Sequence, residues 1–132
     1  MALKITLKPH ERMIIGGAVV SNGDARCCLI IENNVLILRE RDILSEKKAN
    51  TPCTRIYFAI QLMYVDEKNL VLHHTLYWKL VTDVVKAAPS TFGIIKQINE
   101  LILRGEYYQA LKKAKKLIEY EQEVMNRVRK SA

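Results

Sequence analysis

The sequence predicts an α+β protein, in which about five short strands form a small antiparallel, barrel-like unit and about three to four helices follow. In the 132-residue chain, residues 3–44 hold nearly all the alternating apolar patterns and tight-turn residues. After residue 51, apolar residues recur at helical spacing, and the polar segment 45–54 separates the two patterns. We therefore expect a strand unit at residues 1–50 and a helical unit at residues 51–132, which also fits one compact domain.

The first expected strands follow from alternation and from glycine. Leu3, Ile5 and Leu7 alternate with polar residues, so a pleated strand would place the three aliphatic side chains on one face. Residues 13–15 are apolar again, and Gly16-Gly17 supplies two residues that can take positive φ in a tight reversal. The pattern predicts two strands and the start of a hairpin.

The remaining strands are expected to be joined by turns of polar residues. Asn22-Gly23 predicts a type I′ hairpin between residues 18–21 and residues 26–31, because both turn positions of that hairpin need positive φ. Residues 32–34 make the next turn, and residues 35–38 form a last strand before a run of alternating charges.

Cap residues and apolar spacing define the first helices. Thr51 is expected to cap a helix with Pro52 in its first turn. Residues 56–65 are apolar nearly throughout and rich in β-formers, which leaves a buried helix and a strand both open. A longer helix is predicted over residues 70–87, and Pro89 ends it.

A third helix is predicted over residues 92–104. Ser90 or Thr91 is expected to cap it, and its apolar stripe begins at Phe92. Gly105 follows at the position where a left-handed residue is favoured. The last helix, residues 106–127, is amphipathic, with an apolar stripe on one side and lysines on the other.

Composition favours a polyanionic partner and a reducing compartment. The formal net charge of +7 is the electrostatic footprint expected of an RNA-binding protein. Cys27, Cys28 and Cys53 are odd in number and form no CxxC pair, which favours reduced thiols in a cytoplasmic protein. No apolar run approaches the length of about eighteen residues that a membrane span needs, so we expect no membrane association.

The sequence carries no motif that indicates catalysis. It has no Walker loop, no GxGxxG between a strand and a helix, no HExxH and no GxSxG. His73 and His74 are adjacent on a predicted helix and would point about 100° apart, which is poor geometry for shared metal ligation. One of them is expected to be a hydrogen-bonded or partly buried structural histidine. We expect no enzyme activity, no cofactor and no metal.

Four strings occur in order along residues 3–123, namely LKPHERMIIGGAVVSNGD, LRERDIL, TPCTRIYFAIQLMY and GEYYQALKKAKKLIEYE. Their order and spacing resemble the FlbT family, the bacterial regulators of flagellin synthesis. It implies a repressor that acts after transcription on the untranslated leader of flagellin messenger RNA, changing its translation or stability. It also implies that the protein is not an enzyme.

The residues that would contact RNA are expected on exposed basic positions. Arginines of the strand unit would meet an unpaired leader segment, and linker lysines would meet phosphate. On the last helix, a tyrosine at the edge of the lysine face would stack on a base while the lysines bind phosphate. The plainer interpretation of these lysines is a solvated surface. The candidates are Arg26, Arg39, Arg41, Lys47, Lys48, Tyr108, Lys112, Lys113, Lys115 and Lys116.

A protein-interaction module is the alternative function. In that case the helical half would bind flagellin or another flagellar regulator, and effects on the messenger RNA would be indirect. The aromatic residues of segment 56–64 and the Tyr77-Trp78 pair suit this alternative, although for Trp78 a place in the core is favoured. Short exposed strands also favour edge pairing into a homodimer, whereas the charged stretch 39–42 is equally typical of an edge protected against it.

Overall fold

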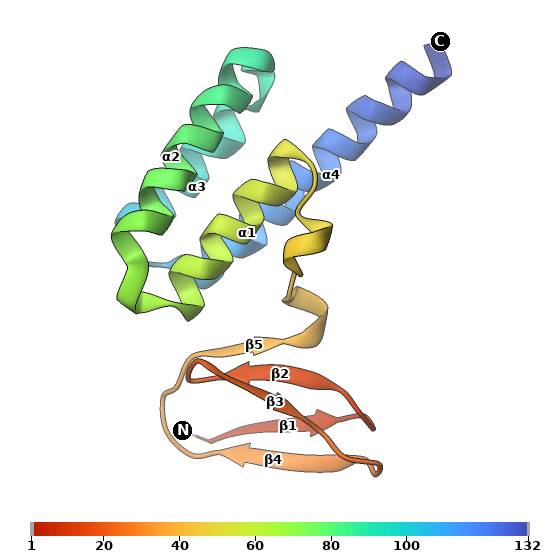
Figure 1. Cartoon of the computed structure of the whole chain (residues 1–132), viewed down its shortest axis with the longest axis vertical. Coiled ribbons are helices and arrows are strands. Elements are labelled where there is room, and N and C mark those ends of the chain that lie inside the picture. Colours follow the sequence, from red (N-terminus) through yellow and green to blue (C-terminus); the bar gives the residue numbers. More distant parts are fainter. Residues whose placement is uncertain (1, 132) are drawn as a thin grey trace. The chain divides into compact units, whose positions relative to one another are not determined.

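The expected α+β fold is confirmed in the computed structural model, which describes residues 2–131 (Figure 1). Contacts divide the chain into two compact units, a strand unit that ends at Ile43 and a helical unit that begins at Leu44. The strands form two small antiparallel sheets that do not close into a barrel.

The strand unit contains one two-stranded and one three-stranded sheet. β1 pairs with β4, and β2 lies between β3 and β5, all antiparallel. The bounds are β1 Leu3–Leu7, β2 Arg12–Ile15, β3 Ala18–Ser21, β4 Cys27–Ile31 and β5 Ile37–Arg39.

One core joins the two sheets of the strand unit. Ile5 and Leu7 of β1 and Met13 of β2 are buried together, and apolar residues of the other strands pack around them. In the register of the first sheet, Ile5 lies opposite Leu29. The predicted alternation is therefore correct, since the buried positions of β1 are two residues apart.

The two predicted hairpin turns have opposite outcomes. Gly16 and Gly17 take φ values of +55° and +85°, and they join β2 to β3 as expected. The prediction of a hairpin at Asn22-Gly23 is wrong, because β3 pairs with β2 while β4 pairs with β1. The side-chain amide of Asn22 donates instead to the carbonyls of Lys8 at 2.8 Å and Ala25 at 2.9 Å. Asn22 thus fixes a loop between two sheets.

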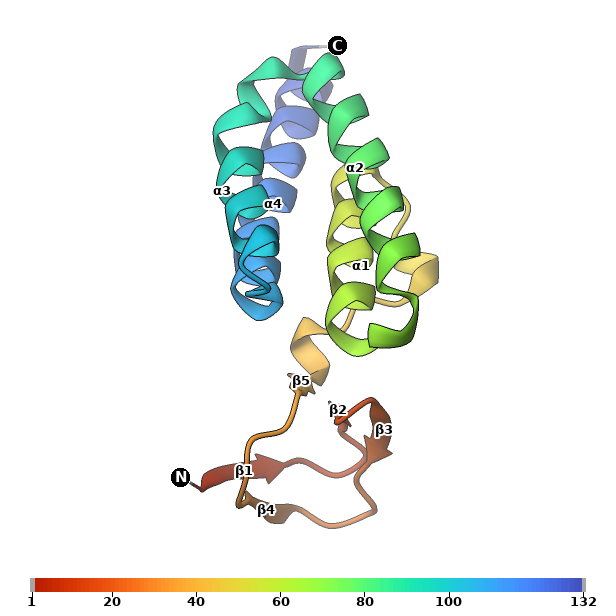
Figure 2. The same cartoon turned by 90° about the vertical axis from the view of Figure 1, so that its left-hand side faces the viewer.

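The helical unit contains four α-helices. α1 packs against α2 and α4, and α3 packs against α4, so that α1 with α2 and α3 with α4 appear as two pairs in Figure 2. Their bounds are α1 Pro52–Val65, α2 Leu70–Ala87, α3 Phe92–Leu103 and α4 Tyr107–Ser131.

The start of α1 is capped as the sequence predicts. The Thr51 hydroxyl accepts from the backbone N–H of Thr54, and the Thr54 hydroxyl accepts from the N–H of Thr51, which makes a capping box. The choice left open for residues 56–65 is settled as helix, because they all lie within α1. Ile56 and Ile60 are fully buried one turn apart.

Three details of α2 and α3 differ from prediction. No side chain caps α3, because the Thr91 hydroxyl donates to the Ala88 carbonyl at 2.7 Å within a short 3-10 turn. Phe92 is 56% exposed and does not open the apolar stripe of α3. Trp78 is 38% exposed rather than in the core, with its ring edge-on to Tyr77 at 5.3 Å between centroids.

Gly105 ends α3 with a left-handed residue, as predicted. Its φ is +75°, its N–H donates to the Ile102 carbonyl, and the N–H of Glu106 donates to the Leu101 carbonyl. These two hydrogen bonds make a Schellman motif.

Alanine at Gly105 is expected to destabilise the protein by about 1 kcal/mol, because a side chain strains positive φ even where space is open. Gly93 is the matched control, since it lies in α3 with open space around it and without positive φ. Gly93→Ala is expected to stabilise by about 0.5 kcal/mol. Urea unfolding measures the change in the free energy of unfolding for both variants. Changes of the same sign in both would contradict the left-handed role of Gly105.

Candidate nucleic-acid interface

Positive charge is concentrated in the helical unit. The strand unit carries 6 basic and 5 acidic groups, an excess of 1, whereas the helical unit carries 15 basic and 9 acidic groups, an excess of 6. A polyanion is therefore attracted mainly by the helical unit.

The densest positive surface is the first half of α4. Residues 107–118 contain four lysines and no carboxylate. The buried stripe of Ala110, Ala114 and Leu117 fixes the rotation of the helix, so that Lys112 and Lys116 are exposed one turn apart. Lys113 and Lys115 are half-buried at the edges of this surface. We call Tyr108, Lys112, Lys113, Lys115 and Lys116 the lysine face.

Tyr108 lies at the start of the lysine face and has two neighbours in contact with its ring. The ammonium of Lys112 lies 4.9 Å from the centroid of its ring, within the range of a cation–π contact. The ring of Tyr64 from α1 is tilted by 41° to that of Tyr108, with the centroids 6.1 Å apart. A half-buried tyrosine with lysines one and two turns further along is suited to stacking on an unpaired base.

The histidines beside this region have structural partners. His73 Nε2 lies 2.9 Å from the Asp66 carboxylate, and His74 Nε2 lies 3.2 Å from the Tyr107 hydroxyl. Hydrogen bonds from Asn69 and then His73 lower the pKa of Asp66. This agrees with the predicted structural histidine. Among residues 2–131, no group of three potential ligands is placed to hold a metal ion.

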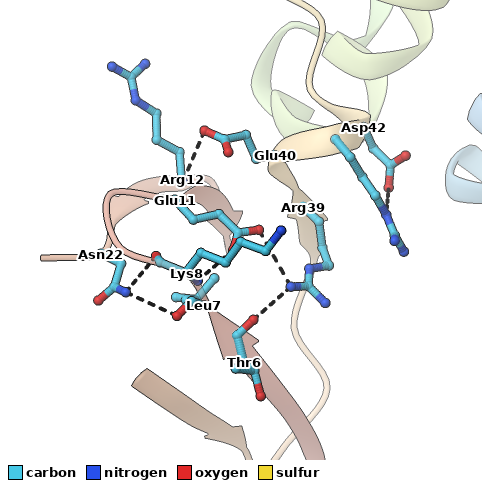
Figure 3. Close-up of polar contacts among 10 residues, drawn as sticks. Thr6, Leu7, Lys8, Glu11, Arg12, Asn22, Arg39, Glu40 and Asp42 are labelled. Carbon is cyan, nitrogen blue, oxygen red and sulfur yellow. Dashed lines mark hydrogen bonds and ion pairs between the residues drawn. The ribbon is translucent and has the colours of Figure 1, made fainter. Parts of the chain in front are cut away.

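Arg39 of the strand unit is part of an internal polar network, which Figure 3 shows. Its guanidinium donates to the Thr6 carbonyl at 3.0 Å and lies 3.6 Å from the Glu11 carboxylate. The same carboxyl group accepts from the N–H of Lys8 at 2.9 Å. Because a neighbouring carboxylate offsets its charge, Arg39 is better placed to join strands than to attract phosphate.

The other four predicted basic residues are exposed but dispersed. Arg26 precedes β4, and Arg41 lies in a 3-10 turn with its Nε 4.0 Å from the Asp42 carboxylate. Lys47 and Lys48 end another 3-10 turn in the helical unit. Of the ten predicted residues, the structure thus brings together those on α4.

Arg12 is a basic residue that the sequence interpretation missed. Its backbone N–H donates to the Glu40 carboxylate at 3.3 Å, while its side chain is exposed and extends away from the other labelled residues in Figure 3. The signal was a charged residue at the start of an apolar segment, because Met13 and Ile14, which follow it in β2, are both buried.

The helical unit also contains an apolar cavity of about 440 Å³, and the start of α1 lies at its wall. The Glu121 carboxylate of α4 accepts from the Thr51 hydroxyl at 2.6 Å and from the Cys53 N–H at 3.0 Å. Burial, followed by the charge of Glu121, raises the pKa of Cys53 to about 12, so the thiol stays protonated at neutral pH.

None of the helices in residues 2–131 is both long and apolar enough to cross a membrane.

A strand unit of two small sheets followed by a basic helical unit defines a small α+β protein. The sequence profile described as "Flagellar protein FlbT" matches residues 3–125. The chain therefore belongs to the FlbT family.

Curated relatives carry the same family name. A "Probable flagellum biosynthesis repressor protein FlbT 1" of Bradyrhizobium diazoefficiens is 52% identical over 94% of this chain and 85% of the relative. The "Flagellum biosynthesis repressor protein FlbT" of Caulobacter vibrioides is 35% identical over 97% of this chain and 92% of the relative. No solved structure gives a significant match. These names support a regulatory role in flagellar synthesis and point to a regulator rather than an enzyme.

Proposed function

We propose that the protein is a cytoplasmic repressor that acts after transcription, by binding the 5′ untranslated leader of flagellin messenger RNA and changing its translation or stability. The observation that carries the proposal is the lysine face, four lysines within residues 107–118 beside a tyrosine that contacts Lys112 and Tyr64. Membership of a family whose relatives are named flagellum biosynthesis repressors supports the regulatory part.

The chemistry of the lysine face suits single-stranded RNA. Each lysine that meets a phosphate releases counterions, which supplies affinity that falls as salt rises. Tyr108 adds a ring on which a base can stack, and such stacking contributes about 1–3 kcal/mol per base. The ammonium groups bind the backbone, while selectivity comes from the bases that reach the tyrosine and from the fold of the leader.

Binding to a flagellin leader RNA, compared with a scrambled RNA of equal length, tests this function. The purified full chain is titrated into each labelled RNA at low and at physiological salt. We expect about tenfold or greater preference for the leader, retained at physiological salt, with both affinities weaker than at low salt. Weak and equal binding to both RNAs would contradict direct recognition.

An exposed uncharged stretch of α2 supports the second candidate function, binding to flagellin or another flagellar regulator. Residues 70–78 carry no charged Asp, Glu, Lys or Arg, yet Val71 is 79% exposed and Leu72 is 67% exposed. Leu72 and Leu76 lie one turn apart on α2 and are both exposed, and apolar side chains on one helix face suit a helix-in-groove contact. Flagellin capture that depends only weakly on salt would favour this candidate over RNA binding. The capture should be lost in Leu72→Asp and retained in Thr82→Asp.

A further inference from the structure

β4 is an edge strand of the strand unit. It pairs with β1 on one side, and no second strand within residues 2–131 pairs with it. In Figure 1 it accordingly lies at the outer border of the strand unit, with β1 on its inner side. The backbone N–H and C=O groups on its outer side are therefore free to pair with a further strand.

β4 lacks the features that usually protect an edge strand. Natural edges are commonly protected by lysine, proline or a bulge. β4 has the sequence CCLII, and it pairs residue by residue with β1 without a bulge. β1, by contrast, carries Lys4, and β5 ends in Arg39. β3 has the sequence AVVS and is equally unprotected, so the residues that flank the two strands must distinguish them.

The inner face of β4 is only partly covered. Ile5 and Leu7 of β1 are 3% and 1% exposed, whereas Leu29 and Cys27, which lie directly opposite them on β4, are half-buried. All four side chains belong to the core of the strand unit. Because β1 covers one side of Leu29 and Cys27, a strand on the outer side of β4 would cover the other.

The charges that flank β4 are complementary when the strand is reversed. Arg26 precedes the strand and Glu32 follows it, and each lies three residues from Leu29. Both side chains are exposed, and neither makes an ion pair with another residue of the described range 2–131. β3 has no such match, because it is flanked by Gly17 and Asn22.

We propose that β4 pairs in the antiparallel direction with β4 of a second copy of the chain, across a two-fold axis at Leu29. The two-stranded sheet becomes four-stranded, with strands in the order β1, β4, β4, β1. Arg26 of each copy then lies opposite Glu32 of the other, and Cys28 lies opposite Ile30 on the same exposed face. Directly opposite side chains are ~5 Å apart at Cβ, which is close enough for an ion pair.

The flanking charges favour a second copy over a foreign strand. Any strand can make the backbone hydrogen bonds of an open edge, so side chains must select the occupant. A foreign strand needs a carboxylate and a basic group at the spacing of Glu32 and Arg26, whereas a second copy supplies both by symmetry. Each ion pair forms twice in such a dimer, and Leu29 meets its own counterpart on the inner face.

Sedimentation velocity of the full chain over a concentration series tests the proposal. The wild type is expected to form a concentration-dependent dimer. Arg26→Glu and Glu32→Arg should each weaken that dimer by about tenfold or more, because each places like charges opposite each other twice. An equimolar mixture of the two variants should dimerise again, because opposite charges then meet at both ends. Lys96→Glu and Glu100→Arg, at exposed positions on α3, make matched charge changes and should leave the dimer unaffected.

The proposal fails if the wild type stays monomeric, if either charge variant dimerises as tightly as the wild type, or if the mixture stays monomeric although both variants are folded by circular dichroism. Ile30→Lys is a second check, because Ile30 is 62% exposed and its replacement leaves the isolated fold intact. The new ammonium lies diagonal to Arg26 of the second copy and should weaken the dimer about tenfold with an unchanged circular dichroism spectrum. An Ile30→Lys dimer as tight as that of the wild type would also overturn the pairing.

Discussion

Reversing two charges on the lysine face, in the double variant Lys112→Glu and Lys116→Glu, is expected to weaken binding of flagellin leader RNA by about 100-fold at physiological salt. Both side chains are exposed, so the change leaves the core of the helical unit untouched. Two phosphate contacts are lost, and two carboxylates then repel the RNA backbone. Fluorescence anisotropy with labelled leader RNA measures the loss.

A matched control separates a local site from general attraction. Lys79 and Lys86 are exposed on α2, so Lys79→Glu with Lys86→Glu makes the same change in net charge elsewhere in the helical unit. We expect this control to weaken binding by only about two- to threefold through the overall field. Equal losses in the two double variants would mean that net charge, rather than the lysine face, determines affinity.

Shortening Leu117 to alanine is expected to lower the free energy of unfolding by about 3 kcal/mol. Leu117 is fully buried on α4, so the change removes apolar contacts and leaves a cavity in the helical core. Leu72→Ala is the matched control, because it makes the same chemical change on α2 at a side chain that is 67% exposed. It should cost less than about 0.5 kcal/mol.

Urea unfolding followed by circular dichroism measures both leucine variants under the same conditions. We expect the loss of unfolding free energy at Leu117 to exceed the loss at Leu72 several-fold. Similar losses would place the core of the helical unit elsewhere than on the buried stripe of α4.

Periodicity was enough to predict most elements because a buried face imposes it. The predicted bounds of residues 70–87 coincide with α2, where Tyr77, Val81 and Val84 are buried at helical spacing. Alternation located β1 for the same reason, since Ile5 and Leu7 face one core. The start of α1 could be predicted from its capping residues, because Thr51 as N-cap and Pro52 in the first turn are adjacent in the sequence.

Strand pairing was mispredicted where long-range contacts override a local turn signal. Asn22-Gly23 fits a hairpin by composition, but β3 reaches β2 and β4 reaches β1. Pairing joins residues up to 28 positions apart, as in Leu3 with Ile31, and no short window of sequence contains that information. The exposure of Phe92 was missed in the same way, because the 3-10 turn before α3 changes which residues face the core.

The candidate site was partly predictable. Helical periodicity was sufficient to gather Tyr108, Lys112 and Lys116 on one side of α4, since one turn separates successive members. The partner that holds Tyr108 is Tyr64, which comes from another helix, and its approach depends on tertiary packing. The role of Arg39 was likewise hidden, because its acceptor is a carbonyl of β1.

Photo-crosslinking of flagellin leader RNA to the full wild-type chain, with mass spectrometric identification of the linked peptides, tests most directly whether α4 is the surface that binds the RNA. We expect crosslinks at Tyr108 and its neighbours on the lysine face, suppressed by excess unlabelled leader RNA but not by scrambled RNA. Crosslinks confined to the strand unit, residues 2–43, would contradict it.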